Sequence, residues 1–250
     1  NEFADSIDVY PLGASGDQPP VRTLQGAATL LDDPSGVAVD LVHDEIVVTD
    51  RTPGAAAIHF FALDSVTPAI PLRSITGAAT GLTDPTAVAV DPLHDEVYVG
   101  SNTALRVFSR TATGNVAPLR VLSGAATGFL GNRGVDVEPF TGEVAVIRTI
   151  PTEAVLFFAR TAAGDTAPLR SIVGALTQLN GPSLHSYFPW LVLADGFETG
   201  TTGGWSLTAT AQRAAGGWRA FFHAPRDARV CAAVRIAFAA VALVNFAALY

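Results

Sequence analysis

The stretch from Pro71 to Val99, PLRSITGAATGLTDPTAVAVDPLHDEVYV, decides the fold, because the chain repeats its landmarks in the same order on both sides. Variants of its opening recur at Pro19–Gly26, Pro118–Gly124 and Pro168–Gly174. The arginines of the four openings follow one another at spacings of 51, 47 and 50 residues: Arg22, Arg73, Arg120 and Arg170. Self-similarity at a nearly fixed period indicates a repeat architecture, so the repeat is interpreted before any single residue.

Each repeat contains four short β-type runs separated by turn residues. In the second repeat these runs are IHFFA, LRSI, AVAV and EVYV, at residues 58–62, 72–75, 87–90 and 96–99. Short runs rich in Val, Ile, Phe and Tyr and bounded by Gly, Pro, Asp and Thr predict an antiparallel meander. The AVAV run is small and apolar throughout, which predicts an innermost strand covered on both faces, with the PLR run outermost.

The predicted fold class is all-β, built from β-propeller blades. Four strands in roughly 49 residues fit a blade better than an α-helical solenoid, because this region shows no helical periodicity over ten or more residues. We expect about four four-stranded units in an incomplete ring. The first unit lacks inner strands of its own, and the last loses the GVAVD-type segment to SLHSYFPW.

The order GVAVD, DEIVVTD, variable loop, IHFFA and PLRSITG resembles the NHL-type bacterial β-propellers over about residues 7–182. This resemblance implies an extracytoplasmic protein, but it leaves the function open because propellers host binding modules, lyases and lactonases. The segment LADGFETGTTGGWS, at residues 193–206, resembles the tail of many secreted bacterial proteins. We therefore expect a propeller region at residues 1–192 and a linker or tail at 193–217.

Residues 218–250 are expected to form a hydrophobic helix. The run from Ile236 to Tyr250 is apolar except for Asn245, and WRAFFHAPRDARVCAAVRIAFA resembles the opening of HTTM-type membrane proteins. One interpretation is a transmembrane helix preceded by an aromatic and arginine-rich interfacial segment; the other is a helix docked on the fold. Arginines before the apolar run would keep its N-terminal side cytoplasmic, which conflicts with a secreted propeller unless two unrelated units are joined.

The charge of the chain limits its partners. Residues 1–200 hold 22 acidic residues and 10 arginines, whereas residues 201–250 hold one acidic residue and five arginines. An acidic repeat region without clustered basic residues argues against a nucleic acid partner. The single cysteine, Cys231, excludes an intrachain disulfide and a cysteine-based metal site. A protein or small ligand is the expected partner, with membrane association through residues 218–250.

Catalytic motifs are missing from the sequence, which has no HExxH, GxSxG or Walker-type loop. His43 and His94 occupy the same repeat position in a DxxHDE turn, which favours a structural role over metal binding. No metal or cofactor is expected, and we predict a non-catalytic extracytoplasmic binding or scaffold module. The alternative is a propeller lyase or lactonase with a metal site in the central channel.

Any ligand is expected on the face that carries the most variable loops, DRTPGAAA, GSNTA and RTIPTEA, because loops on a regular scaffold commonly hold binding residues. The polar side chains predicted to bind there are Asp50, Arg51, Ser101, Asn102, Arg148 and Glu153. The PLR arginines are instead expected to form exposed ion pairs with acidic residues of the same or the adjacent unit.

Overall fold

The computed structural model describes residues 1–11, 13–177, 179, 212–214 and 217–219. The chain divides into two compact units, Asn1–Phe197 and Glu198–Tyr250. The first unit contains the predicted β repeats. The predicted apolar helix falls mostly on residues 220–250, which lie outside the described residues.

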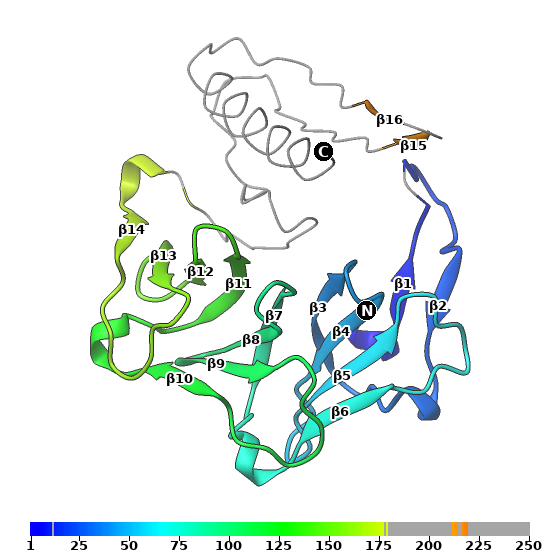
Figure 1. Cartoon of the computed structure of the whole chain (residues 1–250), viewed down its shortest axis with the longest axis horizontal. Helices are drawn as coiled ribbons and strands as arrows, with labels where there is room; N and C mark the ends of the chain where they lie inside the picture. Colours follow the sequence, from blue (N-terminus) through cyan, green and yellow to red (C-terminus); the bar gives the residue numbers. More distant parts are fainter. Residues whose placement is uncertain (12, 178, 180–211, 215–216, 220–250) are drawn as a thin grey trace, which may run out of the picture. The chain divides into compact units, whose positions relative to one another are not determined.

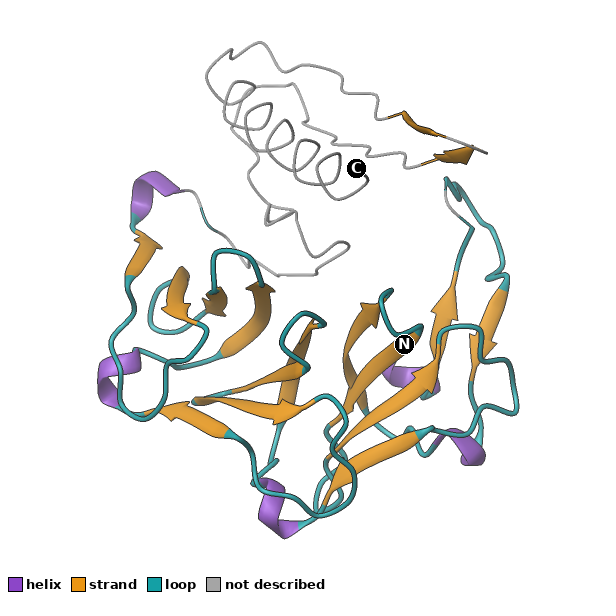
Figure 2. Cartoon of the chain, in the orientation of Figure 1, coloured by secondary structure: helices purple, strands orange, loops and turns teal. Residues whose placement is uncertain are grey.

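Three sheets of the first unit have four antiparallel strands each, in simple sequence order (Figures 1 and 2). The first sheet comprises β3 (Pro34–Asp40), β4 (Glu45–Asp50), β5 (Ala57–Ala62) and β6 (Arg73–Thr76). The second comprises β7 (Pro85–Asp91), β8 (Glu96–Ser101), β9 (Ala104–Ser109) and β10 (Arg120–Ser123). The third comprises β11 (Asn132–Glu138), β12 (Glu143–Arg148), β13 (Ala154–Ala159) and β14 (Arg170–Val173). These meanders are blades of the β-propeller type, as predicted.

A further sheet, which we call the half sheet, has only the strands β1 (Ile7–Val9) and β2 (Arg22–Leu24). The pairing of Val9 with Arg22 matches that of Phe60 with Arg73, so β1 and β2 correspond to β5 and β6. The described residues therefore form three complete blades and the outer half of another. The sequence analysis expected about four units. Within the described residues, the first of these units consists of two outer strands without inner strands.

The AVAV-type strands are innermost and the PLR-type strands outermost, as predicted. Each of β3, β7 and β11 pairs with one strand of its own sheet, and β3 contacts β7 as β7 contacts β11 (Figure 1). The four runs assigned to one repeat in the sequence belong to two neighbouring sheets, with β5 and β6 in one and β7 and β8 in the next. The loop that contains the GAAT turn joins the outer strand of one sheet to the inner strand of the next sheet. Each sheet therefore begins at its inner strand, two strands later than the repeat counted in the sequence.

The hydrophobic core lies between adjacent sheets. Ile58, Phe60 and Ile75 of the first sheet pack with Val97 and Phe108 of the second. Leu105, Val107 and Leu122, at the equivalent positions of the second sheet, pack with residues of the third. Alternate side chains of each strand thus face opposite neighbours, which explains why the strands are apolar on both faces.

Two repeated loop contacts fix the outer part of each blade. The threonine of each GAAT turn donates its hydroxyl to the carbonyl of the turn glycine, as Thr80 does to Gly77 over 2.7 Å. The loop between the third and fourth strands then bonds to the outer strand of the preceding sheet, where Gly114 donates to the carbonyl of Ser74 over 2.7 Å. Adjacent sheets are therefore joined by backbone hydrogen bonds as well as by the core.

In the second unit, β15 (Gln212–Ala214) pairs antiparallel with β16 (Gly217–Arg219). Trp218 and Arg219, the first residues of the predicted helix, lie instead in β16, because Trp218 pairs with Arg213 in this hairpin. No helix within the described part of the chain has the length and hydrophobicity of a membrane span.

Candidate functional site

An antiparallel meander places successive loops at alternate ends of its strands. We call one end the hairpin face; it carries the turns between the first and second strands, at residues 41–44, 92–95 and 139–142. The other end, which we call the loop face, carries the turns between the second and third strands and the loops between successive sheets. The two faces differ in how their polar groups are used.

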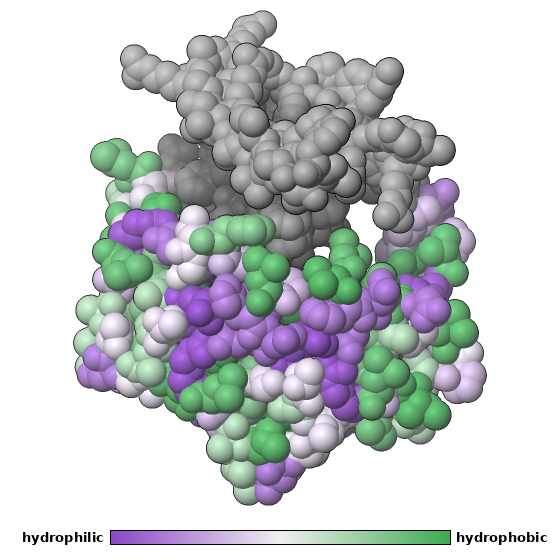
Figure 3. Space-filling model, viewed as in Figure 1, coloured by the Kyte–Doolittle hydropathy of each residue, from purple (hydrophilic) through white to green (hydrophobic). Residues whose placement is uncertain are grey.

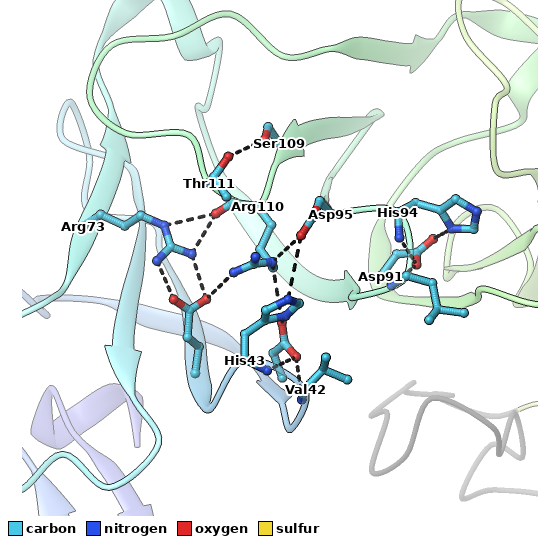
Figure 4. A network of polar contacts seen from close by, with 12 residues as sticks. Val42, His43, Arg73, Asp91, His94, Asp95, Ser109, Arg110 and Thr111 are labelled. Carbon is cyan, nitrogen blue, oxygen red and sulfur yellow. Dashed lines mark hydrogen bonds and ion pairs between the residues drawn. The ribbon is translucent and has the colours of Figure 1, made fainter. Parts of the chain in front are cut away.

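On the hairpin face, Glu45 accepts hydrogen bonds from two arginines of different sheets, Arg73 and Arg110, which Figure 4 labels. Arg73 of its own sheet donates to the two carboxylate oxygens over 2.5 and 2.8 Å. Arg110, which follows β9 of the next sheet, donates from Nη1 over 3.2 Å. Burial alone would raise the pKa of Glu45, but the two guanidinium groups outweigh burial and hold this pKa below its usual value.

The second sheet repeats this arrangement around Glu96. Arg120 binds both of its oxygens over 2.6 Å, and Arg160 of the third sheet donates over 3.0 Å. Burial opposes ionisation here too, but hydrogen bonds from Arg120 and Tyr98 lower the pKa of Glu96 to about 2. Three of the four PLR arginines form the expected ion pairs. The pairs of Arg73 and Arg120 were expected to be exposed and are instead largely buried between sheets, whereas the pair of Arg170 with Glu143 is exposed as predicted.

His43 and His94 are turn residues, as predicted. The Nδ1 atom of each lies 2.8 Å from the aspartate that closes the preceding strand, Asp40 or Asp91. The Asp40 carboxylate also accepts the backbone N–H of His43 over 3.1 Å. Figure 4 shows the two imidazoles in separate turns. Each histidine therefore stabilises its own hairpin.

On the loop face, Asp50 closes the turn of the first sheet. Its side chain is buried and accepts the backbone N–H groups of Asp32 and Asp33 over 2.8 and 3.1 Å, together with the N–H and hydroxyl of Thr52. Burial would raise the pKa of Asp50, but these hydrogen bonds outweigh burial and lower it. Arg51 donates from Nε to Asp33 over 2.9 Å.

Ser101 and Asn102 occupy the equivalent positions of the second sheet. The buried Ser101 hydroxyl donates to the carbonyl of Ala104 over 3.2 Å. Asn102 is exposed, and its Oδ1 accepts the N–H of Gly131 over 2.7 Å, which joins this turn to the loop before the third sheet. Both predicted binding residues thus also hold the backbone in place.

Arg148 takes the position of Asp50 and Ser101 in the third sheet. Its Nε donates to the Thr152 carbonyl over 3.2 Å, and its Nη2 donates to the Thr152 hydroxyl over 3.2 Å. Glu153 is half-buried, and no hydrogen bond or ion pair joins it to another described residue. The six predicted binding residues therefore lie at or within the three turns between the second and third strands on the loop face, two for each sheet.

Arg106 is a loop-face residue that the sequence analysis missed. It lies on β9 and donates from Nη1 to Ser101 over 3.1 Å. Its guanidinium lies against Gly81, and that of Arg148 lies against the equivalent Gly128. Arg106 and Arg148 reach these equivalent positions from different strands, so comparing the repeats position by position does not reveal the match.

Neither Arg106 nor Arg148 has a carboxylate partner within the described residues. The buried Asn132 nearby donates to the Ser101 carbonyl over 3.0 Å, while its Oδ1 atom has no hydrogen-bond partner. In the other two sheets a proline stands at this position, at Pro34 and Pro85. The loop face of the second and third sheets therefore carries two guanidinium groups without a described carboxylate partner and one buried amide oxygen without a hydrogen bond.

Metal ligands are not grouped in the described part of the chain, where no three His, Cys, Asp or Glu side chains are placed to hold a metal ion.

Hydrophilic side chains gather in a band across the middle of the face shown in Figure 3, with hydrophobic side chains around the band.

The fold and the repeated inter-sheet contacts define a β-propeller-type repeat protein. No family model matches the chain. No curated protein matches it either. Among solved structures it is similar to a chain of a nidogen/laminin complex, with 14% identity over 57% of this chain and a TM-score of 0.42. It is also similar to a chain of the hydrazine synthase of Kuenenia stuttgartiensis, with 13% identity over 67% of this chain and a TM-score of 0.45. The match spans 49% of the first of these chains and 42% of the second.

Proposed function

We propose that this protein is a non-catalytic binding module that recognises an anionic group on its partner through the loop face of the second and third sheets. One observation carries the proposal. Arg106 and Arg148 place two guanidinium groups against equivalent loop glycines, and no described carboxylate pairs with either.

The hairpin face provides the internal comparison. There, Arg73, Arg110, Arg120 and Arg160 all bind Glu45 or Glu96, so the acidic repeat region neutralises the arginines that hold its sheets together. An acidic chain tends to repel anions, and guanidinium groups without internal carboxylates are therefore local exceptions suited to a carboxylate, sulfate or phosphate group. Burial lowers the pKa of Arg106, which is expected of a guanidinium that lacks a counter-ion.

The module is placed outside the cytoplasm under the same proposal. The NHL-type order of strands and the secreted-type tail at residues 193–206 support this location, and the HTTM-like residues 218–250 support association with a membrane. Cell fractionation of the full-length gene product tests the location independently of binding.

The binding proposal is tested on an array of acidic peptides and uronic acid oligosaccharides probed with the purified full chain. We expect ligands whose affinity falls about a hundredfold or more in the Arg106→Gln, Arg148→Gln double variant, because each guanidinium donates at least one charge-assisted hydrogen bond, which contributes about 1.5 to 3 kcal/mol. Arg170→Gln is the matched control, because Arg170 is exposed and pairs with Glu143 on the hairpin face. Unchanged affinity in the double variant, or an array without ligands, would overturn the proposal.

A further inference from the structure

Asn132 departs from the repeat at a buried position of the loop face. It begins β11 at the place where Pro34 and Pro85 begin the other two inner strands, and it is 2% exposed. Its Nδ2 donates to the carbonyl of Ser101 over 3.0 Å, but no described group donates to its Oδ1. A buried acceptor without a donor destabilises a fold, and a proline at this place would leave no such group. The orphaned oxygen therefore indicates a function other than holding the fold.

Asn132 connects the two arginines of the loop face. Arg106 donates to the Ser101 hydroxyl over 3.1 Å, and Asn132 donates to the carbonyl of the same serine. Arg148 is the residue directly opposite Asn132 in the pairing of β11 with β12. Side chains directly opposite each other in an antiparallel pair lie on one face of the sheet, with Cβ atoms about 5 Å apart. The three side chains therefore belong to one cluster.

The members of this cluster require different groups of a ligand. A guanidinium only donates hydrogen bonds, so Arg106 and Arg148 suit the oxygens of an anion. The Oδ1 atom of Asn132 only accepts, so it requires a donor, which a simple carboxylate, a sulfate or a fully ionised phosphate lacks. The two guanidinium groups would repel an ammonium donor, which leaves a neutral hydroxyl or amide N–H.

We propose that the loop face recognises a carboxylate whose adjacent carbon carries a hydroxyl or an amide N–H. Arg106 and Arg148 bind the carboxylate, and Asn132 accepts the neighbouring hydrogen bond. Hydroxy acids and the carboxyl end of a peptide both have this chemistry. The inference rests on the proposed function, because it uses the same two arginines.

Access to the buried Oδ1 atom requires a neighbouring side chain to move. Arg148 is held by two hydrogen bonds to Thr152 in an exposed turn and by a long one to Gly128. Surface side chains held in this way change rotamer quickly. We expect Arg148 to rotate toward the bound carboxylate and to uncover the Oδ1 atom of Asn132.

Three probes that differ only in the group on the carbon next to the carboxylate test the proposal: propionate, lactate and N-acetylalanine. Each is titrated into the purified full chain while NMR spectra of the ¹⁵N-labelled protein are recorded. Lactate or N-acetylalanine should bind about tenfold more tightly than propionate, because only these two satisfy the buried acceptor. Alanine, whose donor is a charged ammonium group, should bind no more tightly than propionate.

Asn132→Pro copies the other two sheets and removes the acceptor. It should abolish the tenfold preference and leave the affinity for propionate unchanged. Asn132→Ala, which keeps the backbone N–H, provides the same test if the proline variant does not fold.

Two results would separate this inference from the proposed function. If the three probes bind equally, or if the Asn132 variants keep the preference, the role of Asn132 is wrong, while loss of propionate binding in the Arg106→Gln, Arg148→Gln double variant would still support the proposed function. If none of the probes binds, both are overturned.

Discussion

Arg110 of the second sheet donates to the carboxylate of Glu45 in the first sheet over 3.2 Å, and both side chains are largely buried. Arg160 and Glu96 repeat this contact between the second and third sheets over 3.0 Å. The repeat therefore uses one cation from each blade to complete the ion pair of the preceding blade. This relationship shows that the hairpin face holds the sheets together, and recognition through the loop face is our proposal.

Acid should unfold the protein partly through Glu96. Its pKa is about 2 in the folded chain and 4.5 ordinarily, so its stabilisation is present above pH 4.5 and is lost as the pH falls toward 2. By linkage, this shift corresponds to about 3 kcal/mol. Glu96→Gln should lower the unfolding free energy at pH 7 and flatten its decline between pH 4.5 and 2, as measured by urea titration.

Glu143→Gln is the matched control for the acid experiment. Glu143 binds Arg170 but no second arginine within the described residues, and its side chain is 30% exposed compared with 10% for Glu96. Its loss should therefore cost less at pH 7. An equal cost for the two variants would show that the second arginine does not strengthen the pair.

His59 should make stability depend on pH near neutrality. Burial lowers the pKa of this side chain below 6.5, although the charge of Asp50 partly opposes burial. Because the unfolded chain takes up this proton first as the pH falls, the unfolding free energy should decrease below pH 6.5. His59→Leu, which copies Leu156 of the third sheet, should remove this part of the decrease. A variant with the native slope between pH 7.5 and 5.5 would contradict the assignment.

The buried GAAT threonine should stabilise each loop between sheets. Thr127 donates to Gly124 over 2.7 Å and accepts the buried N–H of Phe129 over 3.2 Å. Thr127→Val keeps the shape but leaves that N–H without a partner, which should cost about 1 to 3 kcal/mol in thermal or urea unfolding. Thr177→Val, the half-buried equivalent after the third sheet, should cost less. Equal losses would mean that burial of the loop does not set the cost.

The repeat predicted the order of strands, the inner and outer positions and the role of His43 and His94, because these depend on local pattern and turn chemistry. Burial of the Glu45 and Arg73 pair could not be inferred from one unit, since it depends on Arg110 of the next. One signal was available, because Arg110 and Arg160 both follow an FxR pattern at the end of a third strand, where the first sheet has Leu63.

The loop face was harder to predict. The sequence identifies Arg148 as a residue that departs from its equivalents, but not Arg106, because the two reach equivalent places from β12 and β9. Backbone roles such as the contact of Asn102 with Gly131 depend on how loops of two sheets meet. Pattern within one repeat carries no information on such contacts.

We propose that the hairpin face stabilises the fold and that the loop face binds a partner. This claim is tested most directly by comparing the unfolding free energies of Arg160→Gln and Arg148→Gln in urea at pH 7. Arg160→Gln removes a guanidinium from the buried Glu96 pair and should cost about 1 to 3 kcal/mol. Arg148→Gln removes two hydrogen bonds to Thr152 in an exposed turn and a long one of 3.5 Å to the Gly128 carbonyl, and it should change stability by no more than about 0.5 kcal/mol. A loss at Arg148 as large as that at Arg160 would contradict the account, because both arginines would then serve the fold.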